Sequence, residues 1–267
     1  MEFFCRSFLL IAFFAGVFSS SAQTDVDKPN FVIIMCDDLG WGDVGFNGGT
    51  HIRTPHLDEM AANGLKLTRF YAQAPVCSPT RASVVTGRHH DRTGIYTANH
   101  GHLRDGEFTL YEALKTKGYT TGHFGKWHMG TLTTKIKDAN RGGPGGAKEF
   151  SPPWHHEVDV TLATESKTPT FDAMWKPVGG SANEFTNASR LGWNVIPEDG
   201  EKEFYGTHYW TGQDTLFDPK SDELLGDDSN LIMDHAMKFI DDSKEGPFLA
   251  IVSVSYTHLR AHETSGY

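Results

Sequence analysis

The surroundings of Cys77 suggest chemistry more directly than those of any other residue in the chain. Cys77 lies in the stretch VCSPTRASVVTGR, with a proline two positions later and Arg81 four positions later. Three interpretations of the thiol are open: a buried apolar side chain, one half of a disulfide, or a reactive thiolate near a helix N-terminus. A helix is predicted over 78–86 and ended by Gly87, which places Arg81 one helical turn from Cys77.

A pair of adjacent carboxylates, Asp37 and Asp38, follows the apolar run FVIIMC at 31–36. This run is rich in β-branched residues and predicts a buried central strand. In an open α/β sheet, ligands bind beyond the carboxyl ends of the strands. Two carboxylates at such a position repel each other, and a hard divalent cation such as Ca²⁺ or Mg²⁺ relieves that repulsion. The other interpretation is a solvated loop pair.

Lys126 and His128 come directly after another predicted strand, at 119–124, in the sequence GKWH. Side chains two residues apart on an extended segment share a face, so these two are expected to point the same way. Each also has an ordinary interpretation, as a solvated loop lysine and a hydrogen-bonded loop histidine.

The elements around these residues alternate between strands and helices, which predicts an α/β fold with a mostly parallel central sheet and helices on both faces. Strands are expected at 31–36, 65–71, 119–124 and 248–254, and helices at 54–64, 78–86, 109–117 and 227–244. The segment 131–225 is rich in Pro, Gly, Trp and Thr and predicts long surface loops over a site.

Length and charge exclude some function classes. The chain has 267 residues, enough for one large α/β domain, and a net charge of −10. An acidic protein is not expected to bind nucleic acid or an anionic membrane without specificity, although a local basic pocket remains compatible with an anionic substrate.

The N-terminus, MEFFCRSFLLIAFFAGVFSSSA, predicts a secretory signal peptide over 1–22 and therefore a secreted or periplasmic protein without a stable membrane span. Cleavage would leave Cys36 and Cys77, which an oxidising compartment could join in a disulfide; their spacing neither supports nor forbids the pair.

Four motifs in order resemble the formylglycine-dependent sulfatases, arylsulfatase-like enzymes of the alkaline phosphatase superfamily. They are DDLGWGD at 37–43, TPHLD at 54–58, CSPTR with TGR at 77–88, and GKWH at 125–128. The likeness extends over about 30–254 and implies an N-terminal catalytic domain over 23–254. In this family the pattern Cys-x-Pro-x-Arg marks a cysteine that a formylglycine-generating enzyme oxidises to Cα-formylglycine, so the resemblance implies that Cys77 is a modified residue.

The same resemblance assigns roles to six residues. It implies that Asp37, Asp38 and residue 77 are ligands of Ca²⁺, with Mg²⁺ as a second possibility, and that Arg81 holds the modified residue. Lys126 would bind a sulfate oxygen, and His128 would bind the second hydroxyl of the hydrated aldehyde and take its proton.

The chemistry implied is hydrolysis of sulfate esters, expected on a sulfated carbohydrate. Hydrated formylglycine carries two hydroxyls on one carbon. One attacks sulfur in line with the leaving alcohol, and deprotonation of the other expels sulfate and restores the aldehyde. A serine offers no second hydroxyl for that release.

Other candidates carry less weight. Arg88 and His56 are interpreted as structural, and His208 and Trp210 as parts of a packed loop. The family's second metal-ligand pair and second lysine are expected beyond this chain, whose C-terminal part is therefore interpreted as missing. His258 falls near the position of a further family histidine but lacks its flanking prolines, in a tail over 255–267 interpreted as non-native.

Two alternatives remain open: a phosphonate or phosphodiester hydrolase of the same superfamily, and a non-catalytic fragment. Phosphate and sulfate esters share geometry, so the motifs alone do not separate the first from a sulfatase.

Overall fold

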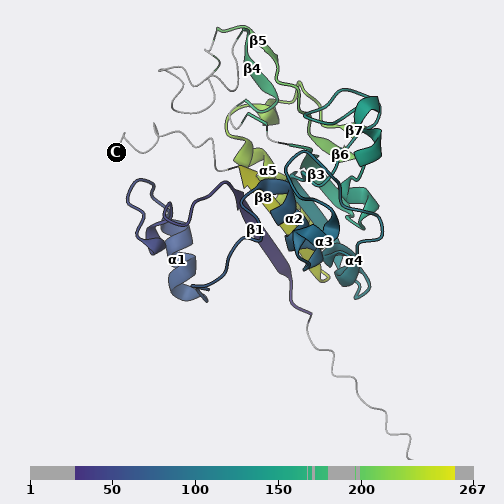
Figure 1. Ribbon diagram of the computed structural model, residues 1–267. Coiled ribbons are helices and arrows are strands. Elements are labelled where there is room, and N and C mark those ends of the chain that lie inside the picture. The colour runs from purple at the N-terminus through teal and green to yellow at the C-terminus, as the bar shows by residue number, and fades with distance from the viewer. Residues whose placement is uncertain (1–27, 167, 170–171, 180–195, 197–198, 256–267) are drawn as a thin grey trace, which may run out of the picture.

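A computed structural model describes residues 28–166, 168–169, 172–179, 196 and 199–255. A six-stranded sheet forms the centre of the fold, in the order β1-β8-β2-β3-β6-β7 (Figure 1). The first four of these strands are parallel, and β6 and β7 are antiparallel to their neighbours. Their bounds are β1 Phe31–Asp37, β8 Phe248–Ser255, β2 Thr120–Lys126, β3 Val160–Thr164, β6 Trp210–Gly212 and β7 Thr215–Leu216.

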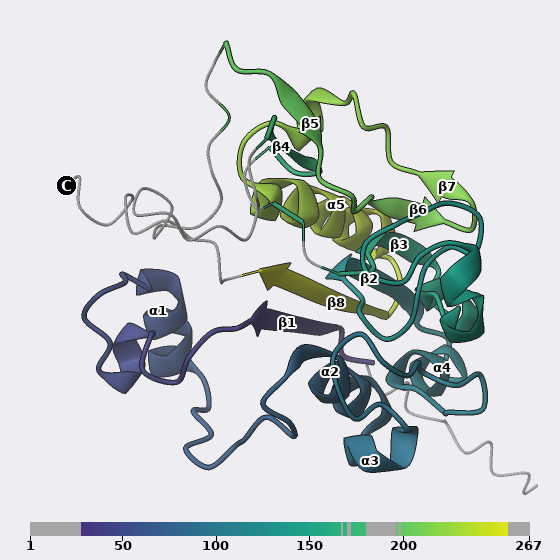
Figure 2. The ribbon, with the colours of Figure 1, turned by 45° about the horizontal axis from the view of Figure 1, so that its top comes forward.

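Helices cover both faces of this sheet, as predicted. In Figure 2, α5 (Asp228–Ser243) lies on one face, and α2 (Cys77–Thr86), α3 (His90–Thr93) and α4 (Leu110–Lys115) lie on the other. Alternate residues of β8 enter the two cores: Leu249 and Ile251 pack with residues of α2 and α4, whereas Ala250 and Val252 pack with residues of α5. The run FLAIVSV is therefore the central, doubly buried strand.

The parallel register brings the carboxyl ends of four strands to one edge. Asp37 of β1 lies opposite Ser255 of β8, and Gly125 of β2 lies opposite Ser253. Lys126, at the end of β2, is paired with Thr164 at the end of β3. Residues from segments far apart in the sequence thus meet where ligands bind in open α/β sheets.

The strand predicted at 31–36 is confirmed as β1, but the prediction that it is buried and central was wrong, and so was the strand predicted at 65–71. Among the described residues β1 pairs with β8 alone and so lies at the edge of the sheet, and its Val32 and Ile34 are 49% and 51% exposed. A continuous apolar run indicates neighbours on both faces, but among the described residues none covers the outer face of β1. The segment 65–71 forms no strand; it has no ladder partner, and Phe70 is 79% exposed.

The prediction of surface loops over 131–225 was also wrong in part. This segment contributes β3 to the central sheet, and Leu162 of β3 is fully buried. It also holds buried polar residues, among them Asp138, Arg141 and Glu165. A separate small sheet pairs β4 (Trp175–Pro177) with β5 (Lys202–Phe204). Short 3₁₀ helices occupy Gly45–Asn47, Pro144–Glu149, Pro153–His155 and Asp222–Leu224.

Helix α1 (Pro55–Asn63) stands beyond the carboxyl end of β1, apart from the layered core (Figure 2). Its first turn is fixed by Asp58, which accepts hydrogen bonds from the Phe46 backbone at 2.7 Å and from the Thr54 hydroxyl at 3.0 Å. No residue of α1 is fully buried.

Among the described residues, no helix combines the length and apolar character that a membrane crossing needs. The predicted signal peptide over 1–22, His258 and the tail over 255–267, except for Ser255 at the end of β8, lie outside the described residues. Cys36 and Cys77 are both free thiols, so the described part of the chain holds no disulfide.

The first testable prediction concerns Asp228, a buried carboxyl at the start of α5 that accepts a hydrogen bond from the Tyr209 hydroxyl at 3.0 Å. Burial raises its pKa to about 7. The folded chain therefore binds more protons than the unfolded chain between about pH 4 and about pH 7, and its stability falls as pH rises through that window.

Asp228→Asn removes the free-energy cost of ionising this buried carboxyl. We expect it to raise the melting temperature at pH 8 by about 3 °C or more and to change it little at pH 4. Asp241→Asn, at an exposed position of the same helix, is the matched control and should show no such gain. Equal changes in the melting temperature of Asp228→Asn at the two pH values would contradict a raised pKa of Asp228.

Candidate active site

Asp37 lies between two cations at the carboxyl edge of the sheet. Arg81 Nη2 donates to Asp37 Oδ1 at 2.8 Å, and Lys126 Nζ donates to Oδ2 at 2.5 Å. All three side chains are at most 8% exposed. Burial opposes ionisation of Asp37, but Arg81 and Lys126 outweigh it and hold the pKa of this carboxyl well below its usual range.

Arg81 connects three elements at this point. From α2, its Nη1 reaches the backbone carbonyl of Lys126 on β2 and the hydroxyl of Ser253 on β8, both at 2.5 Å. Its other terminal nitrogen holds Asp37 on β1. The planar guanidinium suits this fixed set of acceptors, as a lysine ammonium would not. Ser253 was not among the predicted site residues, although a serine at the end of a buried apolar strand indicates such a position.

Cys77 is the first residue of α2, whose N-cap, Val76, offers no side-chain hydrogen bond. Lys126 Nζ lies 3.3 Å from Cys77 Sγ, so one ammonium contacts both Asp37 and residue 77. The predicted helical turn between Cys77 and Arg81 is confirmed, because both lie in α2. The helix ends at Gly87, whose φ of 63° is left-handed.

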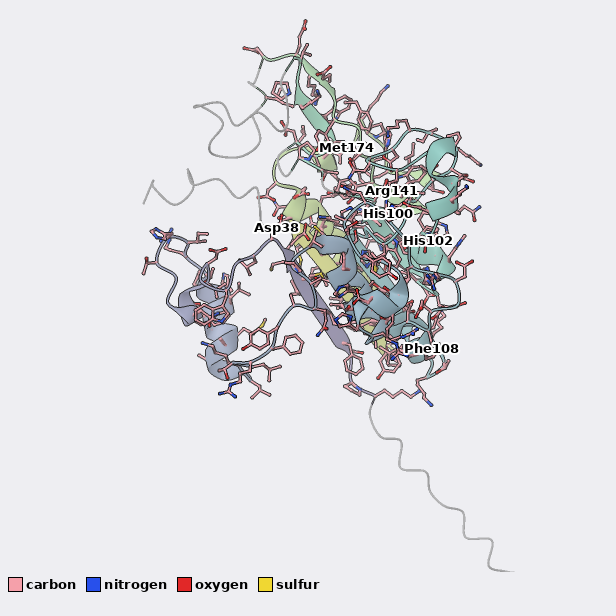
Figure 3. The ribbon with its side chains drawn as sticks, viewed as in Figure 1. Asp38, His100, His102, Phe108, Arg141 and Met174 are labelled. Carbon is pink, nitrogen blue, oxygen red and sulfur yellow. The ribbon has the colours of Figure 1, made fainter. Side chains whose placement is uncertain are left out.

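Asp38 follows β1 with a left-handed backbone, φ 64°. Figure 3 labels it at the carboxyl end of that strand. Ligand atoms of Asp37, Asp38 and Cys77 all lie within 4.8 Å of one another. The predicted pair of carboxylates and the cysteine are therefore brought together in space.

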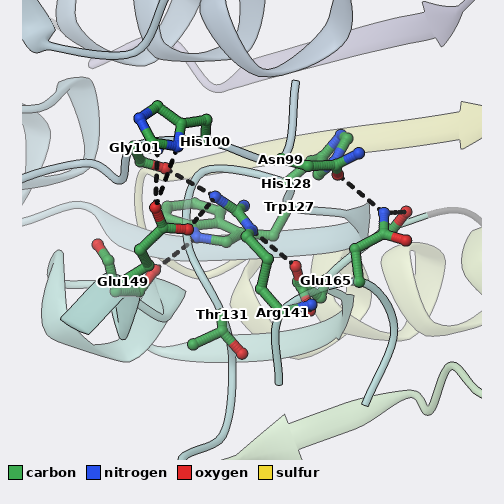
Figure 4. A network of polar contacts seen from close by, with 12 residues as sticks. Asn99, His100, Gly101, Trp127, His128, Thr131, Arg141, Glu149 and Glu165 are labelled. Atoms are coloured by element: carbon green, nitrogen blue, oxygen red, sulfur yellow. Dashed lines mark hydrogen bonds and ion pairs between the residues drawn. The ribbon is translucent and has the colours of Figure 1, made fainter. Parts of the chain in front are cut away.

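His128 is buried and leaves the extended path that sequence analysis expected. Its φ of 55° is left-handed, so the strand conformation ends before it. The Nε2 atom lies 2.7 Å from Asn99 Oδ1 (Figure 4). Burial, followed by the positive charges of Lys126 and Arg81, holds the pKa of His128 well below its usual range, which makes it a neutral imidazole. Sequence analysis missed Asn99, which carries no motif.

The weaker candidates have structural environments. Arg88 pairs with the buried carboxylate of Glu107, and exposed His56 lies in α1. His208 Nδ1 and Trp210 Nε1 lie 3.0 and 2.8 Å from the two oxygens of buried Asp138. These contacts fit the interpretation of His208 as part of a packed loop, whereas Trp210 is packed but begins strand β6 rather than lying in a loop.

Comparison with known proteins decides the family. The profile of the sulfatase family matches residues 29–267. The chain belongs to the sulfatase family. This sulfatase chain is 48% identical to mouse steryl-sulfatase over 112 residues, which are 38% of the chain and 18% of that protein. It is 48% identical to human arylsulfatase G over 118 residues, 42% of the chain and 22% of that protein.

Solved structures support the same fold. The PsFucS1 sulfatase from Pseudoalteromonas sp. superposes with a TM-score of 0.55 at 26% identity, over 85% of the sulfatase chain and 43% of its own. Ps i-CgsB superposes with a TM-score of 0.59 at 24% identity, over 87% and 46%. The chain thus spans about half the length of its structural neighbours, and its match to each curated relative covers about a fifth of that protein's length.

The second prediction tests the balance of charge around Asp37. Arg81→Met removes one of its two buried cations, and breaking a buried ion pair costs about 3–5 kcal/mol. We expect the free energy of unfolding, measured by urea titration, to fall by about 3 kcal/mol. Arg92→Met, at an exposed position of α3, is the control and should cost less than about 0.5 kcal/mol. A loss of similar size in both variants would contradict the buried-pair account.

Proposed function

We propose that this sulfatase chain carries the nucleophile and three metal ligands, Asp37, Asp38 and residue 77, of an enzyme that hydrolyses sulfate esters. Its nucleophile is a formylglycine made from Cys77, and its metal is Ca²⁺, with Mg²⁺ as the second possibility. The observation that supports this most is the contact of one buried ammonium, Lys126, with both Asp37 and residue 77. An anionic substrate needs a cation beside the attacking atom, and Lys126 supplies one at 3.3 Å from Cys77 Sγ.

The residues fit the proposed metal. Asp37 and Asp38 offer hard carboxylate oxygens, and the thiol of Cys77 stands where the hydroxyl oxygens of a hydrated formylglycine would lie. Each Asp37 oxygen accepts one hydrogen bond and keeps a second lone pair for a cation. Because Ca²⁺ takes six to eight oxygens, substrate, water or further residues would supply the rest. When bound, it would lower the pKa of a hydroxyl ligand and withdraw charge from the sulfate.

The chain's own residues divide the remaining work. Arg81 fixes α2, and with it residue 77, to the ends of three strands. Lys126 neutralises charge on a sulfate oxygen beside residue 77. His128, held neutral by burial, accepts the proton of the second hydroxyl when sulfate leaves.

We also propose that the substrate is a sulfated carbohydrate. Mouse N-acetylgalactosamine-6-sulfatase is 39% identical to the chain over 137 residues, 47% of the chain and 26% of that protein. The fold is shared with BT4656, solved in complex with its substrate D-glucosamine-2-N,6-O-disulfate, at a TM-score of 0.55 and 19% identity. The aromatic residues Tyr209 and Trp210 give no support, because both are buried rather than open to a sugar.

Maturation of the proposed nucleophile requires a formylglycine-generating enzyme as a transient partner. The apolar stretch at the N-terminus supports export to the periplasm or the outside of the cell.

The experiment that tests this function compares two substrates. The protein, made together with a formylglycine-generating enzyme, is assayed on an aryl sulfate and on the matching aryl phosphodiester. We expect faster hydrolysis of the sulfate, lost in Cys77→Ala. A preference for the phosphodiester would support the alternative hydrolase, and no hydrolysis of either ester would support the non-catalytic alternative.

A third prediction concerns His128. His128→Asn removes the proton acceptor and keeps a residue type that tolerates the left-handed backbone there. We expect kcat for the aryl sulfate to fall about 10²- to 10³-fold. His56→Asn, at an exposed position in α1, should leave kcat unchanged. A fall of less than about tenfold in His128→Asn would rule out His128 as the general base.

The fourth prediction concerns the metal. EGTA should abolish hydrolysis and added Ca²⁺ should restore it. Asp38→Asn, which also suits a left-handed backbone, should raise the Ca²⁺ concentration for half-maximal activity at least about tenfold, because one ligand charge is lost. Asp241→Asn, at an exposed position of α5, is the control and should leave that Ca²⁺ concentration unchanged. Full activity in EGTA would exclude a Ca²⁺ requirement.

A further inference from the structure

The buried imidazole of His128 has one hydrogen-bond partner at Nε2 and none at Nδ1. Its Nε2 meets the side-chain oxygen of Asn99 at 2.7 Å, whereas buried Nδ1 contacts no polar partner among the described residues. His128 is 3% exposed, so solvent has little access to either nitrogen. A buried polar atom without a partner destabilises the fold, and each such atom in a native structure calls for an explanation, such as a ligand or a reacting group that supplies the missing partner.

The partners of Asn99 determine which nitrogen of His128 carries the proton. Asn140 Nδ2 donates to Asn99 Oδ1 at 2.8 Å and to Ser166 Oγ at 3.1 Å. An amide nitrogen only donates, so Asn99 presents its oxygen, which accepts only. With the two amides oriented as they are in the structure, the Nε2 of His128 is the donor. In the neutral imidazole the proton lies on Nε2, and the lone pair lies on Nδ1.

A network of buried charged side chains fixes the positions of Asn99 and Asn140. Arg141, next to Asn140, donates to Glu165 at 3.0 Å, to Glu149 at 2.9 Å and to the carbonyl of Gly101 at 2.7 Å. Glu149 also accepts from the Gly101 backbone at 3.0 Å. Figure 4 shows how these contacts connect the segment that carries Asn99 to the segments around Arg141 and Glu165. The loops that carry Asn99 and Asn140 are thus fixed by ion pairs that are largely buried.

We propose that Asn99, oriented by Asn140, is a positioning residue that fixes His128 in the Nε2-protonated form and so makes Nδ1 the atom that accepts a proton. This inference rests on the proposed function for its chemical consequence, but not for the tautomer itself. Asn99 adopts a left-handed φ of 63°, a conformation that asparagine tolerates better than most residues.

Proton transfer to Nδ1 releases sulfate and restores the aldehyde. After sulfate has been transferred to one oxygen of the hydrated residue 77, the O–H bond of the other hydroxyl breaks and its proton forms an N–H bond at His128 Nδ1. The electron pair left on that oxygen forms the C=O bond of the aldehyde. The C–O bond to sulfate breaks, and its electrons leave with the sulfate. An imidazole protonated at Nδ1 instead would have no lone pair at this atom.

The first test reads the tautomer without any activity. ¹⁵N-histidine-labelled protein, with Cys77 unmodified, is studied by long-range ¹H–¹⁵N NMR at pH 7.5, and the His128 ring is assigned by its loss in His128→Asn. We expect a pyrrole-type Nε2 and a pyridine-type Nδ1. In Asn99→Gly, which removes the side chain and keeps the left-handed backbone free of strain, the two shifts should move toward an average.

Asp214→Gly is the matched control. It also replaces a residue with positive φ, 57°, but lies in the exposed turn between β6 and β7 and should leave the His128 shifts unchanged. A pyrrole-type Nδ1 in the wild-type protein would overturn the proposal. An unchanged His128 spectrum in Asn99→Gly would do so as well.

A kinetic arm uses the formylglycine-bearing enzyme. We expect Asn99→Gly to lower kcat about tenfold or more while KM stays within about twofold. The reason is that losing the preference for the Nε2-protonated form of His128 affects proton transfer rather than substrate binding. Asn99→Asp, which retains an acceptor for Nε2–H, should recover most of the loss. If the wild-type protein shows the expected tautomer but hydrolyses no sulfate ester, the proposed function fails and the positioning role of Asn99 stands.

Discussion

The buried contact of Asp37 with two cations is the constraint on which the rest of the site depends. A carboxylate with so little access to water is tolerated only when paired, and Arg81 and Lys126 supply one hydrogen bond to each of its oxygens. These partners come from α2 and β2, so satisfying Asp37 also fixes the helix that begins at residue 77 against the end of the sheet. One charge requirement therefore sets the relative positions of β1, β2, β8 and α2.

Much of this arrangement follows from the sequence. Asp37 and Lys126 each end a parallel strand, and Arg81 lies one turn into a helix that starts at Cys77. Parallel strands that share an edge bring such residues together whatever their distance along the chain. The capping box of Thr109 and Glu112 likewise starts α4 at its predicted position.

The failures have equally physical causes. The run 31–36 is apolar on both faces, yet it forms an edge strand. An apolar pattern shows that the side chains favour burial, but it does not show which strands or helices lie next to them. The segment 65–71 is rich in residues with high strand propensity but finds no ladder partner. β3 was missed because it is five residues long and lies in a stretch whose composition indicates loops. His128 was found from its motif, but its left-handed backbone and its contact with Asn99 depend on chain segments that no local pattern connects.

The measurement that tests the account most directly is mass spectrometry of the tryptic peptide FYAQAPVCSPTR, residues 70–81, from protein made in a host with formylglycine-generating activity. The account predicts an aldehyde at position 77 that a hydrazine traps. An unmodified thiol at Cys77, in a host that converts a control substrate, would contradict it and leave the buried cations without the nucleophile they are proposed to serve.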